Sequence, residues 1–168
     1  MIKCNQVWKF GDDITTDVIF PGRYTYKMME DEEMGQFAMI DDPSGFNKKA
    51  APGDVIIGGR NWGCGSSREQ AVKALKARKI SAIIAKGFAR IFYRNALNEG
   101  LLTIVCNEAA DAIQEKDEVS IDLEGARILT SRGEFPFPPY PDFVQGLVAS
   151  GGLVPSVIAR LKKEGRVS

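Results

Sequence analysis

The sequence predicts an α/β fold in which helices flank a mixed sheet, and two observations carry this prediction. Apolar strand-like runs alternate with helix-like stretches, in the order 55–57, 71–79, 81–85, 88–99 and 101–105. This order is typical of a sheet covered by helices. Residues 119–123 and 126–130 then alternate in polarity around Glu124-Gly125, which indicates an antiparallel hairpin with one wet face. We expect a single domain over residues 1–168, because this length suits one hydrophobic core.

The N-terminal part predicts little regular structure. Residues 2–10 alternate loosely and predict an edge strand, whereas residues 11–24 are typical of an ordered loop with one short strand. Asp17 lies beside an apolar run in this loop, so we expect it to be partly buried. Such an acid needs a cationic or N–H partner, for which Arg68 is a candidate; a cap or turn role is the alternative. Residues 25–51 are polar and weakly periodic, which indicates either a mobile loop over a site or a solvated excursion.

The C-terminal part predicts helices on either side of an extended segment. A short helix is expected at 109–116, ahead of the hairpin. The prolines within 135–141 predict an extended linker, because the residue before a proline avoids the helical conformation. Two amphipathic helices at 142–150 and 156–164 are expected to close the chain, with Gly151-Gly152 breaking them apart.

Composition excludes several classes of function. The 22 basic and 22 acidic residues balance without a basic stripe, which excludes nucleic acid as a partner. No apolar run is long enough to span a bilayer and the start of the chain lacks the apolar core of a signal peptide, so we expect a cytoplasmic protein with no membrane partner. Cys4, Cys64 and Cys106 form no C-x-x-C pair. The absence of histidine excludes Ser-His-Asp and Cys-His catalysis and any histidine metal site.

The stretch Arg60 to Ala71, RNWGCGSSREQA, carries the strongest functional signal. Glycines let the backbone approach a ligand closely, and free N–H groups at a helix start attract anions. Ser66 and Ser67 would present two hydroxyls there, and Arg68 a guanidinium. Ser66 and Glu69 also match a capping box, a purely structural explanation. That box accounts neither for the second hydroxyl nor for a cation where the helix dipole disfavours one. We therefore predict a site for a carboxylate or phosphate, with proton chemistry.

Three segments and the end of the chain together resemble a known family. They are GDDITTD at 11–17, NWGCGSSRE at 61–69, the stretch 82–101 and the closing 143–154. They resemble the small subunits of isopropylmalate isomerase and, more broadly, the swivel domain of the aconitase family. The resemblance implies an aconitase-type swivelling β/β/α domain. It also implies an enzyme that removes and re-adds water on a hydroxy di- or tricarboxylate, such as 2-isopropylmalate to 3-isopropylmalate in leucine biosynthesis.

The resemblance assigns roles to the matching residues. Ser66 matches the serine base that takes the proton next to a carboxylate. Ser67 and Arg68 match contacts to a substrate carboxylate, Asp17 matches the acid that helps hold the arginine, and Arg23 is expected to contact substrate. The family's loop that reads the substrate side chain corresponds to Tyr24, Thr25, Tyr26 and Lys27. A hydroxyl can act as a base only where its oxyanion is strongly stabilised, which Arg68 and free N–H groups at a helix start would do.

The resemblance also implies a partner. In the family, a four-iron four-sulfur cluster on a large subunit binds the substrate hydroxyl as a Lewis acid. This chain has no set of cysteines that would hold such a cluster, so we expect no cofactor or metal on it. The expected partners are therefore a cluster-bearing large subunit and a small di- or tricarboxylate, and the isolated chain is a candidate homo-oligomer.

Two departures from the family pattern leave alternatives open. Gln70 stands where the family usually has histidine, which should alter hydrogen bonding around the site rather than the base. Residues 25–28, TYKM, differ from the leucine-containing loops expected for isopropylmalate. Tyr26 and Lys27 favour a more polar substrate, as in a homoaconitase, or fit a methyl- or dimethylmalate dehydratase. An alternative of another class is a non-catalytic anion-binding regulatory module on the same fold.

Overall fold

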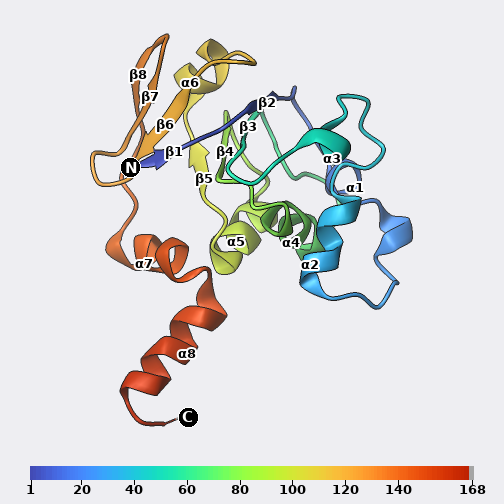
Figure 1. Cartoon of the computed structure of the whole chain (residues 1–168), viewed down its shortest axis with the longest axis vertical. Helices are drawn as coiled ribbons and strands as arrows, with labels where there is room; N and C mark the ends of the chain where they lie inside the picture. The colour runs from blue at the N-terminus through green and yellow to red at the C-terminus, as the bar shows by residue number, and fades with distance from the viewer. Residues whose placement is uncertain (167–168) are drawn as a thin grey trace.

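The computed structural model describes residues 1–166, which form two sheets surrounded by helices (Figure 1). One sheet is parallel, with strand order β2-β3-β4-β5, and the other is antiparallel, with order β1-β6-β7-β8. The α/β class predicted from the sequence is therefore confirmed. The parallel and antiparallel strands that the sequence predicts occupy separate sheets.

The strands are β1 (Ile2–Lys3), β2 (Val7–Lys9), β3 (Val55–Gly58), β4 (Ala82–Ala85), β5 (Thr103–Val105), β6 (Val119–Asp122), β7 (Arg127–Thr130) and β8 (Gly133–Pro136). The helices are α1 (Thr16–Ile19), α2 (Asp31–Met34), α3 (Phe46–Lys49), α4 (Glu69–Ala77), α5 (Arg90–Glu99), α6 (Asn107–Ala112), α7 (Asp142–Ser150) and α8 (Leu153–Lys163). Short 3-10 turns lie at η1 (Gly22–Tyr24) and η2 (Gly35–Phe37).

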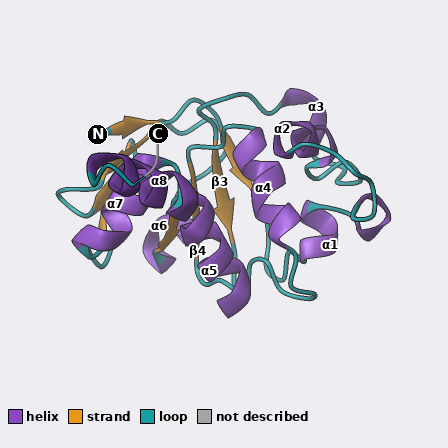
Figure 2. Ribbon diagram, turned by 90° about the horizontal axis from the view of Figure 1, so that it is seen from below, coloured by secondary structure: helices purple, strands orange, loops and turns teal. Residues whose placement is uncertain are grey.

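The parallel sheet is the middle layer of a β/β/α arrangement. Its strands β3 and β4 are buried along their whole length, which is why they read as unbroken apolar runs. Ile56 pairs with Trp8 and Ile83, and these three side chains pack with α4 and α5. Val55 and Ile57 point to the opposite face and pack with the antiparallel sheet and α6. Figure 2 shows α4 and α5 lying against β3 and β4.

Three of the expected segments have another kind of structure than the one predicted, and the short helix expected at 109–116 is α6 at Asn107–Ala112. Residues 2–10 form two strands, β1 and β2, which lie at the edges of different sheets. The strand expected within residues 11–24 is absent, and α1 and η1 stand there instead. The Val18 N–H donates to Thr15 Oγ1 at 3.2 Å, which caps α1. The linker expected at 135–141 begins as the last two residues of β8, which pair with β7 at the sheet edge.

Residues 25–51 are not a solvated excursion. Ala38, Met39 and Phe46 are fully buried in the cluster that also holds α4 and α5. This segment therefore supplies part of the core, although its tip around Tyr26 and Met28 is fully exposed. Its weak periodicity reflects short helices and turns rather than an absence of packing.

The two closing helices end the described chain. Helix α7 has the bounds predicted from the sequence, whereas α8 begins three residues earlier than expected. In Figure 1, α8 extends away from both sheets, and none of its side chains is fully buried. Within residues 1–166, no single helix has the length and apolar character needed to cross a membrane. Helices α7 and α8 have that length and apolar character only when they are taken together, and the two are bent by 93° at their junction.

Candidate functional site

Three loops meet at the carboxyl ends of the parallel strands β2, β3 and β4. The loops are residues 11–15, 59–68 and 86–89. Backbone hydrogen bonds hold the middle loop from both sides: the Gly63 N–H donates to the Ile14 carbonyl at 2.7 Å, and the Ala89 N–H donates to the Trp62 carbonyl at 2.8 Å. In open parallel sheets, ligands bind outside this end of the strands. The fold therefore puts the Gly-Ser-Ser-Arg motif where such a site is expected.

Unusual backbone angles shape the middle loop. Asn61 has a φ of 56°, and its side-chain amide donates to Asp13 Oδ1 at 2.8 Å. Gly63 has a φ of 79°, and a Cβ added there would overlap the ring of Phe92 in α5. Only glycine therefore fits between the loop and α5, which explains one of the two glycines in the motif.

The loop delivers the motif residues into one cleft of about 280 Å³. Its lining residues are Thr16, Gly63, Gly65, Ser66, Ser67, Arg68, Ala89, Arg90, Ile91 and Phe92. Ser66 and Ser67 are exposed in it. The buried Thr16 hydroxyl donates to the Ser66 carbonyl at 2.8 Å and so ties the serine turn to α1. Ser66 thus lies at an open surface on a backbone fixed from both sides.

The capping box that offers a purely structural explanation of Ser66 and Glu69 does not form. Helix α4 begins at Glu69, its N-cap is Arg68, and no side chain caps it. Ser66 therefore precedes the cap by two residues and leaves its hydroxyl unused by the helix. The helix start that lines the cleft belongs to α5, whose first turn runs from Arg90 to Phe92 and has no side-chain cap. The N–H groups of such a turn have no acceptor within the helix.

Arg68 and Asp17 form the ion pair that the sequence predicts. The Arg68 guanidinium donates to Asp17 Oδ1, and the Gly22 N–H donates to the same oxygen at 3.1 Å. The bond from Arg68 is the main reason why the pKa of Asp17 lies below its usual range. Asp17 is more exposed than expected, with 62% of its side chain accessible against 18% for Arg68. The carboxylate therefore stays ionised and fixes the direction of the guanidinium.

Arg23, also expected to contact substrate, lies outside the cleft lining. Its Nη2 donates to Asp41 Oδ1 at 2.6 Å, and its guanidinium carbon lies 4.6 Å from the centre of the Tyr24 ring. Hydrogen bonding to Asp41 raises the pKa of Arg23 above its usual value. In this conformation the charge of Arg23 is already compensated on the surface.

The residues expected to read the substrate side chain also lie outside the cleft lining. Tyr24 stacks on Phe37 with ring centres 4.3 Å apart, and Lys27 Nζ lies 5.0 Å from the centre of the Tyr24 ring. The Thr25 hydroxyl is buried without a hydrogen-bond partner among the described residues. Tyr26 is 93% exposed. The loop is thus anchored by Tyr24 and presents Tyr26 to solvent.

The sequence pattern favours no site role for two polar cleft residues, Thr16 and Arg90. Thr16 precedes Asp17 in the motif at 11–17. No local pattern in the sequence indicates that the Thr16 hydroxyl donates to the backbone carbonyl of Ser66. The helical pattern favours a solvent-facing Arg90. The signal that could have identified Arg90 is the one that identified Arg68, a cation at a helix start, where the dipole disfavours it.

The described residues do not fit an iron–sulfur cluster. Within residues 1–166, no group of three or more histidine, cysteine, aspartate or glutamate residues could hold a metal ion. Cys4 and Cys106 are buried in the cluster beneath the antiparallel sheet, and Cys64 is half-buried. Burial raises the pKa of the Cys4 thiol to about 11, and metal ligation requires the thiolate.

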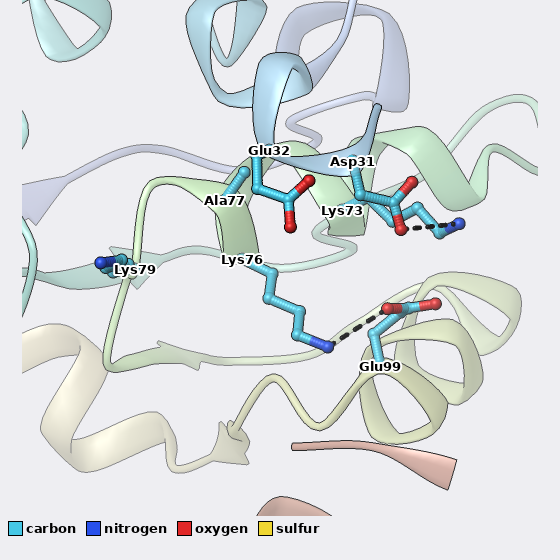
Figure 3. A pocket seen from close by; sticks show the side chains of 7 residues that line it. All are labelled: Asp31, Glu32, Lys73, Lys76, Ala77, Lys79 and Glu99. Atoms are coloured by element: carbon cyan, nitrogen blue, oxygen red, sulfur yellow. Dashed lines mark hydrogen bonds and ion pairs between the residues drawn. The ribbon is translucent and has the colours of Figure 1, made fainter. Parts of the chain in front are cut away.

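A second depression of about 280 Å³ lies between α2, α4 and α5 (Figure 3). Two of its three lysines are paired with acids within the chain. Lys73 Nζ lies 3.2 Å from Asp31 Oδ2, and Lys76 Nζ lies 3.4 Å from Glu99 Oε2. Lys76 Nζ also donates to the Gly151 carbonyl at 2.8 Å. These contacts join three helices and the α7–α8 junction, so the depression is explained by packing without a ligand.

The chain also matches known proteins. Residues 14–109 match the sequence model of the aconitase C-terminal domain. The chain is 47% identical over 161 residues to the 3-isopropylmalate dehydratase small subunit of Thermodesulfovibrio yellowstonii, with 95% of each chain covered. It is 45% identical over 152 residues to the isopropylmalate/citramalate isomerase small subunit of Methanocaldococcus jannaschii, covering 89% of this chain and 90% of that relative.

A solved structure agrees with these matches. The crystal structure of a 3-isopropylmalate dehydratase from Methanocaldococcus jannaschii superposes with a TM-score of 0.88, at 41% identity and with 98% of both chains covered. The resemblance and the aconitase-type fold expected from the sequence are confirmed. This chain therefore belongs to the family of 3-isopropylmalate dehydratase small subunits, which share the aconitase C-terminal domain.

Proposed function

We propose that this chain is the small subunit of an iron–sulfur hydro-lyase that converts 2-isopropylmalate to 3-isopropylmalate by dehydration and rehydration, a step of leucine biosynthesis. The observation that carries the proposal is the single cleft that Ser66, Ser67 and Arg68 line together. Family membership supports the reaction type, because relatives of similar length carry the name 3-isopropylmalate dehydratase small subunit.

Ser66 is the proposed base. A chain without histidine must take the proton from carbon with another group, and no acidic side chain lines the cleft within the described residues. A serine hydroxyl becomes basic enough only where positive charge and N–H dipoles stabilise its oxyanion. Arg68 and the uncapped first turn of α5 lie in the same cleft and are suited to this role.

Arg68 and Ser67 are the proposed contacts to the carboxylate next to the reacting carbon. A guanidinium can grip a carboxylate through two parallel hydrogen bonds, which also fixes the orientation of the substrate. Asp17 is proposed to act through Arg68, because it occupies one side of the guanidinium and stays ionised. Arg23 and residues 24–27 are proposed to meet the substrate side chain only in the complex, because they lie outside the cleft lining here.

A large subunit is the proposed partner. The described residues do not fit the four-iron four-sulfur cluster that the reaction type implies, so we propose that the large subunit carries it and that it supplies the Lewis acid. The roles proposed here for this chain are to bind a carboxylate and to accept a proton at Ser66.

A methyl-substituted malate is the second candidate substrate. One relative at 45% identity is named isopropylmalate/citramalate isomerase, and citramalate carries a methyl group instead of the isopropyl group. Residues 25–28 lack leucine, and Tyr26 and Met28 are exposed. The packing of this segment therefore does not favour 2-isopropylmalate over citramalate. A panel of 2-isopropylmalate, citramalate, dimethylmalate and homocitrate separates these candidates.

The test is reconstitution with a cluster-bearing large subunit. The wild-type pair should turn over one of these hydroxy acids, and Ser66→Ala should lower kcat about 10²- to 10⁴-fold with a small change in KM. Ser131→Ala, an exposed serine in the turn between β7 and β8, is the matched control and should keep full activity. Turnover by this chain alone, or unchanged turnover by Ser66→Ala, would contradict the proposal.

The regulatory alternative makes the opposite predictions. A non-catalytic anion-binding module should bind malate-like ligands tightly as the isolated chain and should not associate with a large subunit. Calorimetry on the isolated chain and on the mixture separates the two functions.

A further inference from the structure

Arg90 occupies an electrostatically unfavourable position. It is the first residue of α5, which has no acidic residue in its first turn and no side-chain cap. The helix dipole puts partial positive charge at this end, so a cation is disfavoured unless an anion lies nearby. Arg90 is exposed, and it makes no ion pair with any of residues 1–166.

The cleft beside Arg90 carries uncompensated positive charge. Its lining includes two arginines, Arg68 and Arg90, and no acidic residue. Asp17 compensates Arg68 from outside the lining, whereas Arg90 has no such partner among the described residues. Arg23, the other arginine expected to contact substrate, is paired with Asp41 and lies outside the lining. Within the described chain, Arg90 is therefore the arginine of this cleft that has no ion-pair partner.

The substrate class supplies the missing anion. A hydroxy dicarboxylate carries two carboxylates on a short carbon chain, and one guanidinium grips only one of them. The cleft, at about 280 Å³, lies near the lower end of small-molecule sites and suits a compact ligand. If Arg68 and Ser67 hold the first carboxylate, the second needs its own cation.

We propose that Arg90 binds the substrate carboxylate that Arg68 does not hold. This inference rests on the proposed function, because that function makes the ligand a dicarboxylate. Arg90 is a substrate-binding residue and takes no part in proton transfer, since a guanidinium stays protonated in proteins. The uncapped N–H groups of the first turn of α5 add to the attraction for the same anion.

The experiment compares Arg90→Gln with Arg94→Gln in the reconstituted complex. Arg94 lies one turn later in α5, is also exposed and does not line the cleft, which makes it a matched control. A lost charge-assisted hydrogen bond should raise KM about 10- to 100-fold in Arg90→Gln and leave kcat within about threefold. Arg90→Lys should fall in between, because it keeps the charge but loses the planar fork. Arg94→Gln should match the wild type.

A set of three inhibitors identifies the group that Arg90 contacts. The probes are a malate-type dicarboxylate and its two monoamides, each of which replaces one carboxylate by a carboxamide. For the wild-type complex, one monoamide should bind about 10-fold or more weaker than the dicarboxylate. For the Arg90→Gln complex, that same monoamide and the dicarboxylate should bind almost equally well. Persistence of both preferences in Arg90→Gln would overturn the inference.

Subunit association tests the competing role, a contact between Arg90 and the large subunit. If Arg90→Gln weakens association and leaves KM unchanged at saturating large subunit, the inference is overturned. An active wild-type complex with an unchanged Arg90→Gln variant also overturns it and leaves the proposed function intact. A wild-type complex inactive on every hydroxy acid overturns the proposed function and this inference together.

Discussion

Asp17 holds Arg68 at the edge of the cleft with one carboxylate oxygen that accepts two hydrogen bonds. Because the bond from Arg68 keeps the pKa of Asp17 below its usual range, the folded chain binds this proton less readily than the unfolded chain. The pair therefore stabilises the fold above the ordinary carboxyl pKa of about 4, and the stabilisation is lost as the pH falls through the lowered pKa.

We expect Asp17→Asn to lower the free energy of unfolding at pH 7 and to approach the wild type as the pH falls below the lowered pKa of Asp17. The difference should be modest, because most of the Asp17 side chain is exposed and solvent screens the pair. Urea denaturation at a series of pH values measures it. Glu115→Gln, at an exposed acid without an ion pair among the described residues, is the control for removing one surface charge. A gap between Asp17→Asn and wild type that widens in acid would refute the assignment.

At the residue scale, the sequence identified the cleft better than the contacts within it. The motif at 61–69 predicted where Ser66, Ser67 and Arg68 come together, and the Asp17–Arg68 pair followed from burial arguments. The helix expected from residue 71 begins two residues earlier, and the capping box offered as the structural alternative does not form. A capping box is a local pattern, while the caps here depend on how the loops after β2, β3 and β4 pack. Those contacts join residues about fifty positions apart, such as Thr16 and Ser66, and no local spacing encodes them.

At the scale of elements, periodicity predicted what is long or regular. Polarity alternates with a period of two residues in the hairpin of β6 and β7. The buried strands β3 and β4 are unbroken apolar runs. Helix α1 has only four residues, too few for a helical period, and it is stabilised by its Thr15 cap and the buried Ile19. Strand β8 carries proline at its end, which an edge strand tolerates because one side of it needs no donors.

The junction of α7 and α8 leads to a paired prediction. Gly152 has a φ of 123°, and an added Cβ would lie 2.7 Å from the Asn98 carbonyl oxygen, so Gly152→Ala should destabilise the chain. Gly146 lies inside α7 with no atom within 4 Å of an added Cβ. Gly146→Ala should therefore stabilise it by about 0.5–1 kcal/mol. Thermal unfolding of both variants provides the measurement, and a stabilised Gly152→Ala would contradict the packing described here.

At the scale of the whole molecule, the parallel sheet shares a buried cluster with each neighbouring layer. This sharing should make the layers unfold together, in keeping with the single domain predicted for residues 1–168. Ile128 of β7 is fully buried on the side of the antiparallel sheet, whereas Trp8 and Trp62 lie in the cluster on the helix side.

Ile128→Ala should lower the free energy of unfolding by about 2–5 kcal/mol through the cavity that it creates. If the layers are coupled, tryptophan fluorescence should shift to the same lower denaturant midpoint as far-ultraviolet circular dichroism. Ser131→Ala in the neighbouring turn serves as the surface control. Fluorescence that keeps the wild-type midpoint while circular dichroism shifts would divide the chain into two independent units.

The serine turn and the segment around Tyr26 are held in different ways. Backbone bonds and the Thr16 hydroxyl fasten the former to the two flanking loops and to α1, whereas Tyr26 and Met28 touch almost nothing within the described chain. Substitutions at Tyr26 and Met28 therefore cost the fold little, while those in the serine turn disturb several neighbours at once. If the segment around Tyr26 selects the substrate and the serine turn moves the proton, as proposed, a lineage of such chains could change the molecule it accepts many times over and keep one unaltered apparatus for moving the proton.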